Sequence, residues 1–154
     1  MLRELRDCDP VIAATFREAD EVMQPLLGHP LTDYIFVNGD EAALAQAKRE
    51  LQNTIITQPA VLTVNVALMR LLESYGLVPD MVIGHSLGEY AALVTAGVLT
   101  FADALQVVSA RGREMNRVSL GDNGCMAAIS APLPEVERIL ASIEGYVVLA
   151  NINS

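Results

Sequence analysis

The chain has 154 residues, of which 52% are hydrophobic and 19% charged, and its formal net charge is −9. This length suits one domain, or one domain and part of a second, with a sizeable buried core. The acidity argues against a nucleic-acid partner, because phosphate binding depends on clustered Lys and Arg.

The sequence also carries no sign of a membrane span or a metal site. Every long apolar run is interrupted by polar residues, and the charged N-terminus does not resemble a secretion signal. The two cysteines, Cys8 and Cys125, fit neither a metal-binding spacing nor a disulfide framework. We therefore expect a cytoplasmic protein with no membrane association and no metal.

The first half of the chain reads as helices. Asp9 followed by Pro10 predicts an N-cap and first helical residue, and apolar residues then recur at helical spacing up to Gly28. A second helix is expected over 41–51. A third should open at Pro59 and run to Gly76; it is apolar nearly all round and should be buried.

The second half predicts strands as well as helices. Residues 78–83, 125–130 and 146–152 read as short strands, with helices over 87–96, from Thr100 to about 117, and over 134–143. A break is expected at 121–124. These elements predict an α/β fold with a parallel sheet, divided into a core over 1–124 and a βαβ unit over 125–154.

The stretch Gly84-His85-Ser86-Leu87-Gly88 is the clearest candidate for chemistry. A G-x-S-x-G sequence between a strand and a helix is typical of a nucleophile elbow, a sharp turn that exposes a reactive serine. The structural alternative is that Ser86 and Glu89 form a capping box, which requires no chemistry.

A nucleophilic serine needs a base, and the chain offers only His29 and His85. His85 is adjacent to Ser86, and neighbouring side chains on a sharp turn diverge, so it should pack or hydrogen-bond beneath the turn. His29 reads as a surface residue of a turn. Because no histidine follows Ser86, the Ser…Asp…His order of the hydrolases is not completed here.

Several separate segments resemble malonyl-CoA:acyl-carrier-protein transacylases and the acyltransferase domains of fatty-acid and polyketide synthases. They are TQPA at 57–60, GHSLGEYAAL at 84–93, AGV at 96–98 and ARG at 110–112. The resemblance implies an α/β-hydrolase-like core with the start of a small ferredoxin-like subdomain at 125–154. It also implies that the chain covers about half of a family member. The family's first strand, its GQG-type loop and its catalytic histidine are not in this sequence.

The resemblance assigns roles to four residues. Ser86 would take the acyl group from coenzyme A as an ester and pass it to the phosphopantetheine thiol of an acyl carrier protein. The backbone N–H of Leu87 would help to stabilise the oxyanion. Arg111 would hold the free carboxylate of the malonyl group, and Gln58 would lie near the substrate. Coenzyme A would enter only as the thioester substrate, with no bound cofactor.

Each assignment has a structural alternative. Arg111 could be a solvated charge on an exposed helix face, although a guanidinium is well suited to grip a carboxylate with two parallel hydrogen bonds. Gln58 could cap the helix that starts at Pro59. Glu89 reads as structural, and Met115 reads as a core residue.

Three functions follow from these patterns. The leading one is malonyl transfer to a carrier protein through a seryl ester. The alternatives are a serine hydrolase or thioesterase that uses the same turn, and an inactive fragment that serves as a scaffold. A hydrolase of neutral esters would not need a guanidinium at position 111, so this residue discriminates between the two enzymes.

Overall fold

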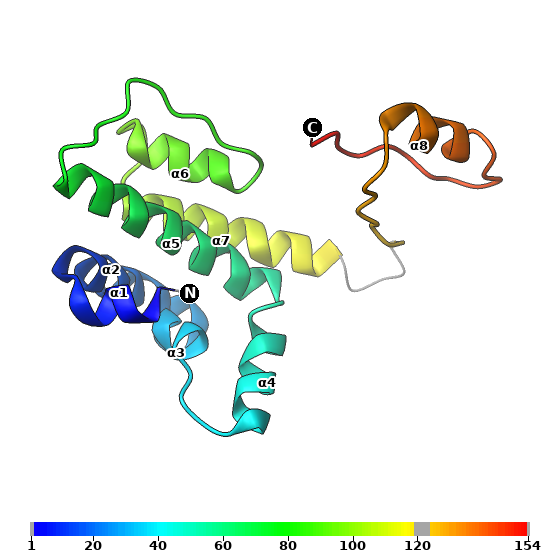
Figure 1. Ribbon diagram of the computed structural model, residues 1–154. Helices are drawn as coiled ribbons and strands as arrows, with labels where there is room; N and C mark the ends of the chain where they lie inside the picture. The colour runs from blue at the N-terminus through cyan, green and yellow to red at the C-terminus, as the bar shows by residue number, and fades with distance from the viewer. Residues whose placement is uncertain (1, 119–123, 154) are drawn as a thin grey trace. The chain divides into compact units, whose positions relative to one another are not determined.

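The computed structural model describes residues 2–118 and 124–153, in two compact parts, Met1–Gly121 and Asp122–Ser154, which we describe separately (Figure 1). The first part contains seven helices among its described residues, and the second contains one. The helices are α1 Arg3–Cys8, α2 Pro10–Leu27, α3 Leu31–Ile35, α4 Glu41–Glu50, α5 Thr54–Ser74, α6 Gly88–Thr95, α7 Phe101–Val118 and α8 Leu133–Leu140.

Helix α5 lies at the centre of the first part and packs against α2, α7, α6 and α3 (Figure 1). Leu62 and Val66 are fully buried, but Leu68 is 36% and Leu72 is 50% exposed, so the helix is buried on one side and not all round as its apolar composition predicted. Among the described helices, α5 alone is long and apolar enough to cross a membrane. Within its most apolar stretch, 44% is buried in the protein. Core helices of soluble proteins can have the same length and apolar composition.

The amphipathic helices were predicted well because their end signals are local. Helix α2 begins after Asp9, whose carboxylate accepts hydrogen bonds from the N–H groups of Val11 and Ile12, and it ends at Gly28. Helix α7 follows Thr100, whose hydroxyl accepts from the Asp103 N–H at 3.1 Å, which confirms the predicted start.

Other helix ends differ from the predictions. Helix α5 begins at Thr54 rather than Pro59, because the side chain of Asn53 accepts from the Ile55 N–H and starts the helix a turn and a half earlier. Helix α8 begins at Leu133 and ends at Leu140, three residues before the predicted end. The short helices α1 and α3 were not predicted.

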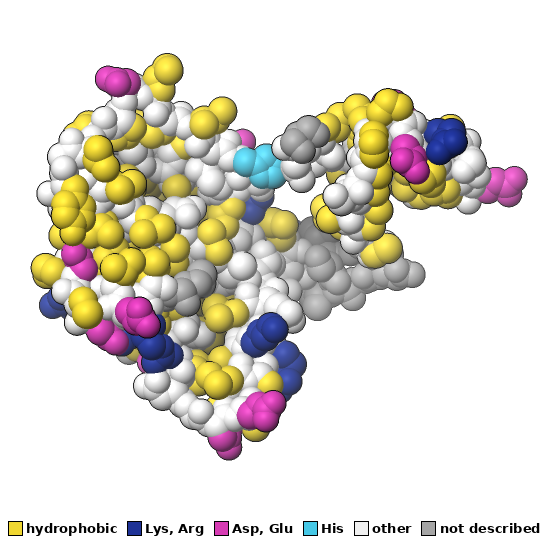
Figure 2. Space-filling view, viewed as in Figure 1, with side chains coloured by type: hydrophobic (Ala, Val, Ile, Leu, Met, Phe, Trp, Pro, Cys, Tyr) yellow, Lys and Arg dark blue, Asp and Glu magenta, His cyan; other side chains and the backbone are white. Residues whose placement is uncertain are grey.

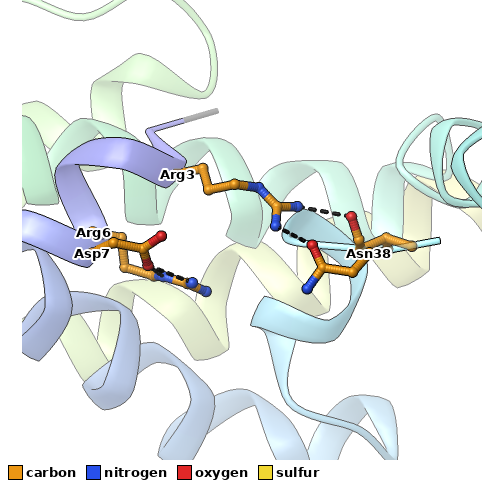
Figure 3. Close-up of polar contacts among 5 residues, drawn as sticks. Arg3, Arg6, Asp7 and Asn38 are labelled. Atoms are coloured by element: carbon orange, nitrogen blue, oxygen red, sulfur yellow. Dashed lines mark hydrogen bonds and ion pairs between the residues drawn. The ribbon is translucent and has the colours of Figure 1, made fainter.

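Helix α1 is tied to the segment that follows α3. The Arg3 guanidinium donates to Asn38 Oδ1 at 2.5 Å and to the Val37 carbonyl at 2.8 Å, as Figure 3 shows. The Arg6 guanidinium lies 4.1 Å from the centre of the Phe36 ring, in cation–π geometry. These contacts bring the beginning of the chain close to the connection between α3 and α4.

The predicted α/β fold with a parallel sheet is wrong for this structure, because its described residues form helices and no strands. The predicted strands at 78–83, 125–130 and 146–152 are extended or irregular segments. A strand is defined by hydrogen bonds to a neighbouring strand, and the described residues supply no such neighbour to these segments. The predicted break at 121–124 lies outside the described residues except for Gly124, which has φ of 80°.

Candidate active site

The turn that carries Ser86 connects a segment without helix or strand, residues 77–85, to α6. Ser86 has φ of 53°, and Leu2 is the other non-glycine residue with positive φ among the described residues. This left-handed conformation is disfavoured for a residue with a Cβ atom. Strain of this kind is characteristic of residues held in place for function.

The capping-box interpretation of Ser86 is wrong. Leu87 is the N-cap residue of α6, and no side chain caps this helix. Ser86 lies one residue earlier, and its Oγ atom is 3.3 Å from Arg111 Nη2, which donates to it. The serine side chain therefore faces a guanidinium rather than the backbone of its own helix.

Arg111 is the centre of the polar cluster around Ser86. While one terminal nitrogen, Nη2, faces Ser86, the other, Nη1, donates to Gln58 Oε1 at 2.7 Å. Arg111 is half-buried. The structure thus brings together Gln58, Ser86 and Arg111, which the sequence had singled out. The side chain of Arg111 is therefore not a freely solvated charge.

Gly112 explains how Arg111 reaches the site. A Cβ atom at this position would lie 2.8 Å from the Thr54 carbonyl oxygen and 3.1 Å from Ile55 Cα. Only glycine permits this close approach of α7 to the first turn of α5. The ARG sequence at 110–112 therefore combines the functional side chain with the residue that lets its helix come near enough.

Two further residues complete the cluster and were not assigned to it from the sequence. Gln58 Nε2 donates to Thr54 Oγ1 at 2.7 Å and to Met115 Sδ at 3.4 Å. Met115, which was expected in the core, is 45% exposed. Helical spacing offered a signal, because Thr54 and Met115 lie one turn from Gln58 and Arg111 on their respective helices.

The backbone N–H of Leu87 belongs to the N-cap residue of α6. The next three N–H groups, of Gly88, Glu89 and Tyr90, donate to carbonyls of residues 85–87. The Leu87 N–H makes no backbone hydrogen bond within the described part of the chain. Its position beside Ser86, at the positive end of a helix, suits a developing negative charge on an oxygen atom.

His85 is exposed, so the prediction that it packs beneath the turn is wrong, while the alternative that it hydrogen-bonds there stays a prediction. Within residues 2–118 and 124–153, no group of three or more His, Cys, Asp and Glu side chains gathers in a way that could hold a metal ion. The chemistry that this cluster can supply is a serine hydroxyl, a backbone donor and an oriented guanidinium.

Comparison with known proteins agrees with this cluster. The family model of the acyl transferase domain matches residues 1–154. The malonyl CoA-acyl carrier protein transacylase of Bacillus subtilis is 37% identical over 99% of this chain and 46% of its own length. A phenolphthiocerol synthesis polyketide synthase of Mycobacterium marinum is 42% identical over the whole chain and 7% of its own length. The chain belongs to the acyl transferase domain family of fatty-acid and polyketide synthases.

Solved structures give the same assignment. The acyltransferase domain from the second module of the salinomycin polyketide synthase has a TM-score of 0.70 and 42% identity, over 92% of this chain and 30% of its own. A malonyl-transacylase in complex with a type II polyketide synthase acyl-carrier protein has a TM-score of 0.64 and 38% identity, over 76% of this chain and 34% of its own. The chain spans less than half the length of these relatives.

Proposed function

We propose that this chain supplies the nucleophile and the carboxylate-binding residue of an acyltransferase that moves malonyl groups from coenzyme A to an acyl carrier protein. The observation that carries the proposal is the contact of 3.3 Å between Arg111 Nη2 and Ser86 Oγ, in a turn where Ser86 has positive φ. It places a permanent positive charge beside the hydroxyl group to which an acyl group would be attached.

The reaction would proceed in two transfers. Ser86 Oγ attacks the thioester carbonyl of malonyl-CoA, the carbon–sulfur bond breaks, and coenzyme A leaves as its thiol with the proton that Oγ lost. The phosphopantetheine thiol of the carrier protein then attacks the seryl ester. A new carbon–sulfur bond forms, the ester bond between the acyl carbon and Oγ breaks, and Oγ takes up the proton that the thiol lost. In each transfer the Leu87 N–H would stabilise the negative charge that develops on the carbonyl oxygen.

Arg111 would select the acyl group. A malonyl group ends in a carboxylate, which a guanidinium binds through two parallel N–H···O bonds, whereas an acetyl group has no charge to bind. Within the described part of the chain, the contacts with Ser86 and Gln58 use two of the five N–H donors of this guanidinium, which leaves three donors for a carboxylate. A hydrolase of neutral esters would gain nothing from this arrangement.

The relatives support an acyl carrier protein and malonyl-CoA as the two partners. One similar solved structure is a malonyl-transacylase in complex with an acyl-carrier protein, and one similar curated protein is named for transfer from malonyl-CoA. We propose the same two partners for the protein that carries this sequence.

The test is acyl loading of Ser86 by malonyl-CoA and acetyl-CoA, measured by mass spectrometry in a full-length acyltransferase domain that carries this sequence. We expect a single malonyl adduct that Ser86→Ala abolishes. Arg111→Ala should lower malonyl loading by about 30-fold or more, because the substrate carboxylate loses its charged partner. Acetyl loading should change little, and Arg111→Lys should restore malonyl loading only in part.

Arg117→Ala is the matched control, since Arg117 lies on the same helix, is exposed and pairs with Glu114. An equal fall for both substrates in Arg111→Ala would return Arg111 to a structural role. Release of free malonate without transfer to a carrier protein would favour the hydrolase, and a wild-type protein without any adduct would favour the scaffold.

A further inference from the structure

The amide group of Gln58 is held in one orientation. Its oxygen accepts from Arg111 Nη1 at 2.7 Å, and its nitrogen donates to Thr54 Oγ1 and Met115 Sδ. A guanidinium carries donors only, so a flipped amide would set N–H groups against N–H groups. Gln58 is 3% exposed, and a buried amide must keep its partners.

The guanidinium that Gln58 contacts has no carboxylate partner among the described residues. Among the described residues, the ion pairs of arginine with a carboxylate involve Arg6, Arg70, Arg117 and Arg138. Arg111 has no such pair there, and its strongest described contact is the neutral amide oxygen. A neutral acceptor fixes the direction of the guanidinium without cancelling the charge that a substrate carboxylate would need.

The backbone packing makes this contact specific. Gln58 lies on α5 one turn after Thr54, and Thr54 is the residue against which Gly112 of α7 packs. The two helices therefore approach each other closely one turn from Gln58 and next to Arg111. An arginine side chain has several rotatable bonds, and a fixed acceptor at this point restricts it to the conformers that face Ser86.

We infer that Gln58 is a positioning residue that sets the preference for acyl groups with a free carboxylate by holding Arg111, an inference that rests on the proposed function. Gln58 does not contact the substrate in this scheme. It binds one terminal nitrogen of the guanidinium, which leaves the other directed at Ser86 and at the group attached there. The amide in place of a carboxylate keeps Arg111 ready for an anionic substrate.

The experiment compares Gln58→Leu and Gln58→Glu in the full-length acyltransferase domain that carries this sequence, with malonyl-CoA and acetyl-CoA as substrates. Leucine removes the acceptor, and we expect the KM for malonyl-CoA to rise by about 10-fold while kcat changes little, as for loss of one hydrogen bond to a charged group. Glutamate should pair with Arg111 and compete with the substrate, so malonyl loading should fall further, by about 100-fold.

Acetyl loading should be nearly unchanged in both variants, because that substrate does not use the guanidinium. Gln46→Leu is the matched control, since Gln46 on α4 accepts from Arg49 Nη2 at 2.7 Å and takes no part in the cluster around Ser86. If the leucine variant does not fold, Gln58→Glu carries the comparison, because it keeps both the volume and an acceptor for Arg111.

A second readout does not depend on activity. In NMR spectra the terminal nitrogens of Arg111 should show hindered rotation in the wild type and rapid rotation in Gln58→Leu. Equal losses for both substrates, or an Arg111 signal that does not respond to the leucine change, would overturn the inference. If the wild type takes no malonyl group while the Arg111 signal responds as expected, the proposed function fails and the positioning contact stands.

Discussion

At the scale of single residues, Ser86 occupies a conformation that glycine would adopt more easily. Its φ of 53° lies in the left-handed region, which raises the energy of a residue with a Cβ atom by about 1–2 kcal/mol. The hydroxyl group is what distinguishes serine from the residue that this turn would otherwise favour. The backbone strain therefore lies at the residue whose hydroxyl group is proposed to react.

Replacement of Ser86 should reveal this strain in the free energy of unfolding. Ser86→Gly and Ser86→Ala both remove the hydroxyl and its contact with Arg111, but only glycine relieves the strain. We expect the glycine variant to be more stable than the alanine variant by about 0.5–1 kcal/mol, because its greater freedom in the unfolded chain offsets part of the relief. Urea unfolding of the two variants gives this difference directly, and an alanine variant at least as stable as the glycine variant would contradict it.

At the scale of the elements, the two glycines of the G-x-S-x-G sequence have different roles. A Cβ atom at Gly84 would lie 2.2–2.3 Å from backbone atoms of Gly88 and Glu89, so the turn closes directly over this position. A Cβ atom at Gly88 would meet nothing within 4 Å. Gly84 is thus required by the tight turn, whereas Gly88 begins α6 without any steric need for glycine.

Alanine at these two positions should therefore have opposite effects. Gly84→Ala should lower the free energy of unfolding by about 3 kcal/mol, because backbone atoms must move apart to admit the methyl group. Gly88→Ala should leave it unchanged or raise it by up to about 1 kcal/mol, since alanine is the better helix former. Thermal unfolding of the two variants, each of which adds one methyl group, measures both changes. Similar losses of stability in both variants would show that the tight turn at Gly84 is not the cause.

The helices were more predictable than the segments between them. Asp9, Gly28 and Thr100 mark helix ends through contacts within a few residues, and such signals are legible in sequence. The segment 78–83 has the apolar composition of a strand, but strand formation depends on a partner elsewhere, which composition does not reveal. The lack of pairing of this segment within the described residues was therefore not predictable from its composition.

The site was predictable to a different degree. Ser86 and Arg111 stood out through short sequences that resemble a known family, and the structure places them 3.3 Å apart. Helical spacing offered a signal for Thr54 and Met115, but their contacts with Gln58 and the exposure of Met115 depend on how closely α5 and α7 approach, which the sequence does not give. Gly112 decides that approach, and its role becomes visible only when the opposing helix is in place.

At the scale of the whole molecule, the first part combines a well-packed helical core with an exposed apolar connection. Phe16 and Leu62 are buried in the core, whereas Met81 is 89% and Ile83 is 97% exposed in the connection between α5 and α6. Figure 2 shows hydrophobic side chains on the visible face, interspersed with other atoms. Exposed apolar side chains on a segment whose backbone pairs with no strand among the described residues favour association with other chains.

The chain of 154 residues, expressed alone, should therefore associate with itself, and the connection before α6 should control this association. We expect Ile83→Lys to lower both the apparent mass in analytical ultracentrifugation and the fluorescence of a dye that binds apolar surface, because a charge on an extended segment opposes its pairing with another chain. Leu44→Lys is the control, since Leu44 is 51% exposed on α4, where the backbone is already hydrogen-bonded within the helix. If the two variants reduce association equally, general charge rather than this connection is responsible. If neither does, the exposed apolar connection is not the surface through which the chains associate.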